Sequence, residues 1–349
     1  MDRRSRLFGV CWHRARAPVA DWFVEEARLC GPSLLGGVEA PACPRYKGCM
    51  DTINWVGRHV PVPGLGELWS EAAGPADGPP VLLVMGAMNP SHFWPPAFVA
   101  ALVRAGCRVL RYDHRDTGRS FVMPPAAPSY ALDELVADAL RVLDAWGLTR
   151  VAVVGWSMGG YIAQHLAHEH PARVSRLVLL ASTPDHRPYM AATLGRPVPT
   201  DGLPGPVPGF LPALLSTATG ARGRHPEDVA VQGWKVFHGG SHPFPAAMVR
   251  EQARAALADG HQPLAAMHHA LAVDRASPRT AWLPALRVPT LVLHGAEDPC
   301  LPLPHGQALA RLIPGARLSV LDMGHLLPDA LAAPVGDQVA AFIVAEKVG

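Results

Sequence analysis

A nucleophilic serine is indicated at residues 155–159, which read Gly-Trp-Ser-Met-Gly. An apolar stretch, VAVV, comes directly before this segment, and a stretch with helical spacing follows it. On a tight strand-to-helix turn the serine hydroxyl is pushed out above the sheet, and glycines two residues before and after it avoid clashes with nearby backbone. The helix N-terminus would also place amide donors where negative charge develops during acyl transfer. We predict that Ser157 is a nucleophile; an accidental glycine-rich turn is the alternative.

A serine hydroxyl needs a base within hydrogen-bonding reach, and 17 histidines compete for that role. His325 is favoured because it directly follows the last predicted strand, which puts it at the same edge of the sheet as Ser157. Asp298 follows the preceding predicted strand, so it reaches that edge as the group that orients the base. Glu297 is its neighbouring competitor, but a proline directly after Asp298 fixes the turn there. Asp322 is the weaker third candidate, since it is expected to lie at the end of its strand.

Acyl transfer also requires backbone donors for the oxyanion of the tetrahedral intermediate. The amide of Met158, the residue after the nucleophile, is one expected donor. The second is expected in the loop after the first buried strand, where the sequence reads Met-Gly-Ala-Met-Asn at 85–89. Ala87 is our choice, with Gly86 supplying flexibility. A simple turn after a strand is the alternative.

The remaining polar clusters predict no metal site and no cofactor. His165, His168 and His170 lie on and after the nucleophile helix, but no carboxylate or cysteine completes a ligand set, so a structural role is favoured. Residues 112–120, YDHRDTGRS, lack the glycine-rich pattern of a phosphate-binding loop. We expect this loop to brace the rim of the active site.

The elements that must position these residues alternate between strands and helices. Buried or half-buried strands are expected at 58–62, 65–71, 80–85, 108–112, 150–155, 175–180, 290–294 and 316–321. Helices are expected at 97–105, 132–146, 158–168, 306–312 and 335–345. Such alternation is typical of a mostly parallel, doubly wound sheet in an α/β fold. Residues 185–280 interrupt it with many prolines and helical stretches, and we expect this lid segment (residues 185–280) to cover the edge of the sheet where open α/β sheets bind ligands.

The expected domains are therefore an N-terminal extension at 1–56, a first core part at 57–184, the lid segment, and a second core part at 281–349. Apolar and aromatic residues near the expected site favour an apolar small-molecule substrate, although packing would explain each of them. They are Trp94, Trp156, Trp234, Phe237, Met248 and Met267.

Composition narrows the function classes further. The chain of 349 residues has a net charge of +2, which gives no general attraction to nucleic acid or to acidic membranes. No segment reaches the about 18 apolar residues of a membrane span, and the apolar run after the basic start is too short for a secretory signal. We expect a cytoplasmic monomer or homodimer with no nucleic-acid or membrane partner. Four of the six cysteines lie before residue 50, and the Cys43–Cys49 pair would suit a disulfide or half of a zinc site. We expect residues 1–49 to be a disordered extension or upstream sequence from a misassigned start, with a cysteine-bearing accessory segment as the alternative.

Several stretches resemble one known group of enzymes. They include RYDHRDTGRS at 111–120, VVGWSMGG at 153–160, DGLPGP at 201–206 and VPTLVLHGAEDP at 288–299. Over roughly residues 57–349 the chain resembles the α/β-hydrolase superfamily, and within it aclacinomycin methylesterase and related polyketide methyl ester esterases. The resemblance implies Ser157, Asp298 and His325 as nucleophile, acid and base, and oxyanion amides at Ala87 and Met158. Ala87 departs from the second glycine of the expected Gly-Gly pair.

The sequence thus predicts a cofactor-free serine esterase that acts through an acyl-enzyme on a carboxylic ester, such as the methyl ester of an aromatic polyketide. Acyl transfer, amide hydrolysis and C–C bond hydrolysis on the same triad remain alternatives. A binding protein that keeps the fold without turnover is an alternative of another class.

Overall fold

The structure is a computed structural model that describes residues 53–124, 129–199, 202–221 and 223–345. Within these ranges eight strands form one sheet in the order β1-β2-β4-β3-β5-β6-β7-β8. The strands are β1 (Val56–Val62), β2 (Gly66–Ala73), β3 (Pro80–Val84), β4 (Arg108–Tyr112), β5 (Val151–Trp156), β6 (Val174–Leu180), β7 (Thr290–Gly295) and β8 (Arg317–Leu321).

The sheet is antiparallel at one end only. The pairs β1–β2 and β2–β4 are antiparallel, whereas the pairs from β4 through β3, β5, β6 and β7 to β8 are parallel. Strands β3 and β5 read as unbroken apolar runs because helices cover both of their faces. The α/β fold with a mostly parallel sheet, expected from the sequence, is confirmed.

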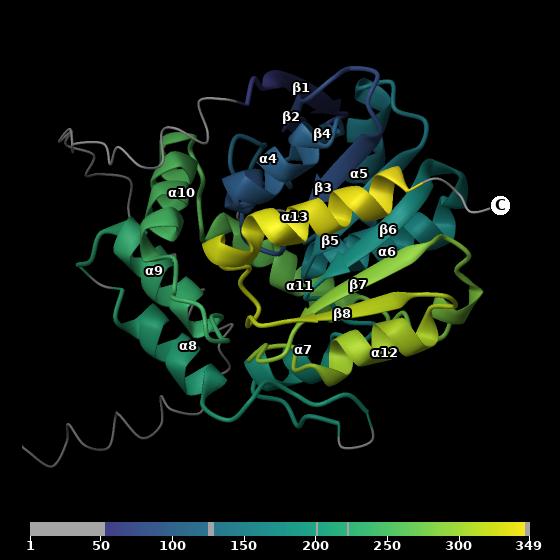
Figure 1. Ribbon diagram of the computed structural model, residues 1–349. Coiled ribbons are helices and arrows are strands. Elements are labelled where there is room, and N and C mark those ends of the chain that lie inside the picture. Colours follow the sequence, from purple (N-terminus) through teal and green to yellow (C-terminus); the bar gives the residue numbers. More distant parts are fainter. Residues whose placement is uncertain (1–52, 125–128, 200–201, 222, 346–349) are drawn as a thin grey trace, which may run out of the picture.

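Helices enclose the sheet from both sides (Figure 1). On one face α4 (Pro96–Arg104) and α13 (Asp329–Val344) pack together, and Leu102 and Val339 are fully buried there. On the other face α5 (Leu132–Ala145), α6 (Met158–Glu169) and α12 (Pro304–Leu312) bury residues such as Ile162 and Leu309. Each such side chain stabilises the fold by about 1.5–3 kcal/mol relative to exposure. The result is a rigid platform for loops at the edge of the sheet.

Helix α13 differs from the sequence-based expectation. It begins at Asp329 rather than Val335 and contains Pro334. A proline within a helix removes one backbone hydrogen bond, yet Pro334 lies in the second turn, where little of the helix precedes it. Burial of Ala332 and Val335 in the core compensates for the lost bond.

The N-terminal boundary also lies earlier than expected. Strand β1 begins at Val56, and before it Ile53 and Trp55 pack against the hydrophobic core. The guanidinium of Arg111 lies over the Trp55 ring, 4.1 Å from its centroid. The expectations about residues 1–49, including the Cys43–Cys49 pair, fall outside the described residues.

The lid segment connects β6 to β7 and is helical in its described parts. It contains α7 (Arg187–Thr193), α8 (Phe210–Thr219), α9 (Pro226–Val236), α10 (Ala246–Ala258) and α11 (His268–Arg275), together with the short 3-10 helix η3 (Ala265–Met267). In Figure 1 α8, α9 and α10 stand together beside the sheet. Across the described chain, we find no helix with the length and apolar character needed to cross a membrane.

Two helical glycines provide a matched test of this packing. A Cβ on Gly159 in α6 would lie 2.0 Å from the carbonyl oxygen of Val84 in β3, whereas a Cβ on Gly233 in α9 would meet nothing within 4 Å. We predict that Gly159→Ala lowers the free energy of unfolding by about 1–3 kcal/mol. Gly233→Ala should instead raise it by about 0.5–1 kcal/mol, because alanine favours the helix. Urea unfolding measures both; an unchanged Gly159→Ala would contradict the close approach of α6 to β3.

Candidate active site

Ser157 occupies the turn between β5 and α6 in a strained conformation. Its φ of 55° and ψ of −118° place a residue with a side chain in a region that glycine prefers. The turn fits only because its neighbours lack side chains: a Cβ on Gly155 would lie 2.3 Å from the carbonyl oxygen of Gly159. The sequence predicted this turn and its two glycines.

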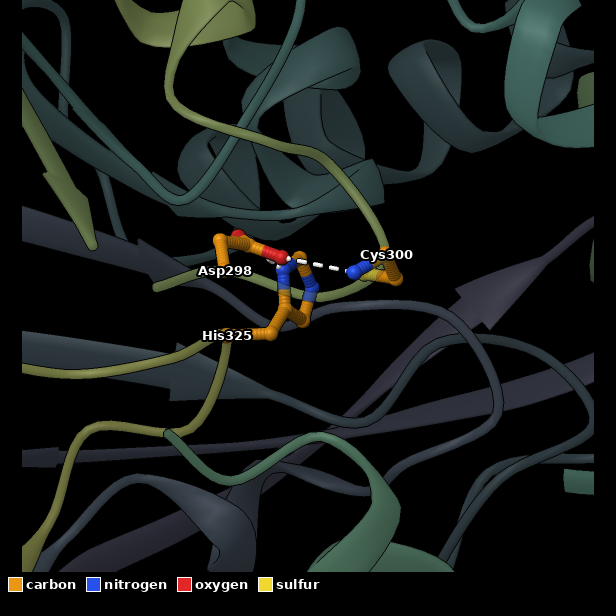
Figure 2. A group of neighbouring side chains, drawn as sticks. All are labelled: Asp298, Cys300 and His325. Atoms are coloured by element: carbon orange, nitrogen blue, oxygen red, sulfur yellow. Dashed lines mark hydrogen bonds and ion pairs between the residues drawn. The ribbon is translucent and has the colours of Figure 1, made fainter. Parts of the chain in front are cut away.

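His325 and Asp298 are brought together by loops that follow adjacent strands. Asp298 comes after β7 and His325 after β8, and His325 Nδ1 lies 2.7 Å from Asp298 Oδ2. Figure 2 shows the imidazole directed at the carboxylate. The same His325 loop reaches the serine turn, because the indole Nε1 of Trp156 donates to the backbone carbonyl of His325 at 3.1 Å. All three predicted triad residues therefore lie on loops at one edge of the sheet.

The carboxylate of Asp298 is buried but well compensated. Its Oδ1 accepts the backbone amides of Cys300 at 3.0 Å and Leu301 at 2.9 Å, while Oδ2 accepts from His325. Burial by itself would raise the pKa of Asp298, but His325 and these hydrogen bonds outweigh it and lower the pKa below the ordinary value. Asp298 is thus held as an anion that favours a proton on Nδ1 of His325.

Cys300 lies beside this pair and completes a compact group of possible metal ligands (Figure 2). The donor chemistry fits hydrogen bonding better than metal binding. Both oxygens of Asp298 already accept hydrogen bonds, and burial raises the pKa of the Cys300 thiol well above its usual range, so that sulfur stays protonated. A neutral thiol is a weak ligand for zinc.

The two competing carboxylates hold the lid segment instead. Glu297 accepts the backbone amide of Gly240 at 3.1 Å, and Asp322 accepts the backbone amide of Ser241 at 3.0 Å. Both side chains are exposed. Of the three acids weighed from the sequence, the structure brings Asp298 to His325.

The lid segment also touches the His325 loop through its backbone. The carbonyl oxygen of Phe237 accepts the amides of His325 at 2.9 Å and Leu326 at 3.2 Å. A Cβ on Gly324 would lie 2.5 Å from the amide nitrogen of Gly239, so the two backbones are in direct contact. Sequence reasoning missed this contact because it involves backbone atoms, which carry no residue-specific signal.

The loop after β3 faces the serine. A Cβ on Gly86 would come within 3.3 Å of the Ser157 Cβ, so residue 86 approaches the nucleophile closely. The amide of Ala87 donates to no described residue, and Met158, as the first residue of α6, has no carbonyl one turn earlier in its helix to accept its amide. Both amides are thus available as donors close to Ser157.

The aromatic residues near the site have different surroundings. Trp94 and Trp156 are almost fully buried, with their ring centroids 5.5 Å apart, and Met248 is buried as well, so packing explains these three. Trp234 and Phe237 in the lid segment are partly exposed, and the Phe237 ring centroid is 5.8 Å from that of His325. Met267 is also partly exposed and precedes α11. The partly exposed residues are the ones free to touch a substrate.

The charged loop at 112–120 makes the contacts expected of a brace. Asp113 Oδ1 accepts the amide of Ser91 at 2.7 Å, and Nε2 of His114 donates to the carbonyl of Met85 at 2.9 Å. Arg115 forms two hydrogen bonds with the fully buried Asp138 at 2.7 and 2.8 Å. Elsewhere, His165 pairs with Glu169 at 2.6 Å, in line with a structural role.

Comparison with known proteins settles the family. The family described as alpha/beta hydrolase fold matches residues 79–329. The chain belongs to this α/β-hydrolase family. It is 38% identical over 292 residues to rhodomycin D methylesterase DnrP of Streptomyces peucetius, a match that covers 80% of this chain and 96% of that protein. Rhodomycin D methylesterase DauP of Streptomyces sp. strain C5 is also 38% identical, over 293 residues, with the same coverage.

The solved structures agree with this assignment. A hydrolase from Pseudomonas aeruginosa PA01 superimposes with a TM-score of 0.62 at 27% identity, covering 83% of this chain and 98% of that one. The resemblance to polyketide methyl ester esterases of the α/β-hydrolase fold is therefore confirmed. The enzyme class expected from the sequence, a carboxylic ester hydrolase, agrees with these relatives.

Several buried histidines that are neutral in the folded protein should make its stability depend on pH. Burial, the largest cause at each site, lowers the pKa of His186 and His269 to about 3 and of His261 and His305 to about 4, from 6.5. Below pH 6.5 the unfolded chain therefore binds protons that the folded chain does not. We predict that the contribution of these neutral imidazoles to the free energy of unfolding is fully present above about pH 6.5. It decreases as the pH falls toward 4, by up to about 1.4 kcal/mol per pH unit for each imidazole.

The measurement is urea unfolding between pH 4 and pH 8. His305→Gln should make the free energy of unfolding less dependent on pH, by the equivalent of up to one bound proton, because it removes one buried imidazole. His59→Gln, at an exposed side chain on β1, is the control and should leave the slope as it is. A stability that is constant between pH 7 and pH 4.5 would contradict the prediction.

Proposed function

We propose that this α/β-hydrolase is a serine esterase that cleaves a carboxylic ester through an acyl-enzyme. The observation that carries the proposal is the 2.7 Å contact between His325 Nδ1 and Asp298 Oδ2, next to a serine in a strained turn. With Nδ1 protonated and directed at the carboxylate, Nε2 of His325 is left with a lone pair to accept a proton. The names of the two rhodomycin D methylesterases support the same chemistry.

In the proposed mechanism Nε2 of His325 removes the proton from Ser157 Oγ as this oxygen attacks the ester carbonyl. The amides of Ala87 and Met158 donate to the resulting oxyanion. His325 then protonates the leaving alkoxide, which departs as the alcohol, and the acyl group stays on Ser157. Water, deprotonated by the same imidazole, attacks the acyl-enzyme, and collapse of the second intermediate releases the acid and restores the serine.

The substrate class we favour is a methyl ester on an apolar aromatic molecule. Support comes from the named substrates of the two relatives and from the lid segment. The ring of Trp234 stacks on Phe93 with centroids 5.5 Å apart, and Phe237 lies between Trp234 and His325. Partly exposed aromatic faces near the base suit a planar acyl group. Methyl esters of aromatic polyketides, compared with p-nitrophenyl acyl esters, test this preference.

The nucleophile is tested by Ser157→Ala. We expect this variant to lose at least about a thousandfold in kcat on p-nitrophenyl acetate, because no covalent intermediate can form. An active-site fluorophosphonate should label wild type with one equivalent and leave the variant unlabelled. Equal hydrolysis by both proteins, or a wild type that neither turns over esters nor reacts with the probe, would refute the esterase.

The choice of acid is tested by two neighbouring amide substitutions. Asp298→Asn should lower kcat by about 10³–10⁴-fold, because the amide cannot stabilise the imidazolium or hold the required tautomer. Glu297→Gln, one residue earlier and exposed, should stay within about threefold of wild type. The reverse ranking in steady-state kinetics would assign the role to Glu297.

A further inference from the structure

Met88 follows the proposed oxyanion donor Ala87 and has an unusual backbone. Its φ is 67°, in the left-handed region that residues with side chains rarely adopt. Such a conformation persists only where surrounding contacts enforce it. The contact that meets the Met88 backbone comes from the lid segment, 181 residues later in the sequence.

That contact is made by His269, the second residue of α11. Nδ1 of His269 lies 2.9 Å from the amide nitrogen of Met88, and its Nε2 lies 3.0 Å from the carbonyl oxygen of Arg115. An amide can only donate and a carbonyl can only accept, so Nδ1 must be the acceptor and Nε2 the donor. His269 is fully buried, and burial together with nearby His114 lowers its pKa to about 3, which agrees with this neutral tautomer.

A second imidazole holds the other end of the same loop. Nε2 of His114 donates to the carbonyl of Met85, and the His114 ring meets the His269 ring edge to face, with centroids 5.5 Å apart and planes at 86°. The stretch between these two anchors is Gly86 and Ala87, where residue 86 faces Ser157. The backbone of Gly86 and Ala87 is thus held at both of its ends.

We infer that His269 is a positioning residue that holds the oxyanion loop in its working conformation, so that the lid segment takes part in catalysis as well as in substrate contact. This inference rests on the proposed esterase function. Nothing in it requires His269 to touch the substrate. Its role is to accept a hydrogen bond from the Met88 amide, while the side chain of Asn89 donates to the Ala87 carbonyl at 2.8 Å. Together these two contacts hold the peptide that follows Ala87, and this limits the backbone rotation that would turn the Ala87 amide away from the oxyanion.

The two hydrogen bonds of His269 can be separated with a matched pair of substitutions. In His269→Asn the side-chain oxygen takes the position of Nδ1 and can still accept from Met88. In His269→Gln the longer side chain reaches toward the Arg115 carbonyl and leaves the Met88 amide without its acceptor. His268→Gln is the control, because neighbouring His268 faces Asp116 Oδ2 at 3.1 Å rather than the oxyanion loop.

We expect kcat on p-nitrophenyl acetate to fall about 30–100-fold in His269→Gln, with KM within about threefold, because a small displacement of a catalytic donor has costs of this order. His269→Asn and His268→Gln should stay within about threefold of wild type in kcat. The rate of fluorophosphonate labelling should fall in parallel with kcat in His269→Gln, whereas the final stoichiometry of labelling reports the folded fraction. A merely structural histidine would change the stoichiometry or the melting temperature and leave the rate per active site unchanged.

Three results would overturn the assignment: wild-type kcat per active site in His269→Gln, an equal loss in the Asn and Gln variants, or a rise in KM alone. If a variant does not fold, a measurement on the wild-type protein still tests the proposal. Nitrogen-15 NMR at pH 7 should show His269 as the neutral Nε2–H tautomer, and a protonated or Nδ1–H ring would contradict the proposal. If wild type hydrolyses no ester and does not react with the probe, the proposed esterase function is wrong. If wild type is active but the His269 variants or the NMR spectrum differ from expectation, only the proposed role of His269 is wrong.

Discussion

The strained turn at Ser157 is the constraint on which the rest of the structure depends. A residue with a side chain at φ 55° costs on the order of 1–3 kcal/mol, so its surroundings must enforce it. The amide of Ser157 donates to the Leu180 carbonyl at 2.9 Å, and the Ser157 carbonyl accepts from Gly160 at 2.9 Å and from the Ser182 hydroxyl at 3.0 Å. These contacts tie the turn to the end of β6. The close approach of α6 to β3 and β5 explains the glycines at 155 and 159, and a Cβ on Gly160 would lie 2.3 Å from Oγ of Ser182, the residue that holds the Ser157 carbonyl.

The parallel sheet converts this local constraint into a site. Strands β5, β6, β7 and β8 are neighbours and run in the same direction, so the loops after them emerge at one edge. Asp298 and His325, after β7 and β8, therefore need no long loop to meet. Burial of the carboxylate would destabilise it, but two amides from its own loop and one imidazole satisfy both oxygens. The charge is thereby placed directly beside the imidazole of His325.

How much of the fold and of the site could be predicted depends on whether each feature is encoded by neighbouring residues or by contacts between distant ones. Buried parallel strands read as apolar runs, and the serine turn needs its glycines, so the fold and the places of Ser157, Asp298 and His325 in it were predictable. Trp94 and Trp156 show where such reasoning ends, because an aromatic residue beside a motif looks the same whether it lines a site or fills the core. Helix α13 began earlier than its proline suggested, since burial outweighed a local propensity. The contact of His269 with Met88 depends on how the lid segment docks, which no pattern of adjacent residues encodes.

The lid segment is anchored to the core on both sides of the proposed site. On the β7–β8 side the Phe237 carbonyl accepts two amides of the His325 loop, and Glu297 and Asp322 accept amides at 240 and 241. On the other side Asp259 pairs with Arg119 at 2.7 Å, and the Gly118 amide donates to His261 at 3.2 Å. The first set of contacts meets the loop that carries the base, and the second meets the charged loop at 112–120, which is itself hydrogen-bonded to Met85 and Ser91 on either side of the oxyanion loop. In this arrangement a change in lid packing alters the geometry of the reacting groups, so it bears on kcat as directly as on substrate binding.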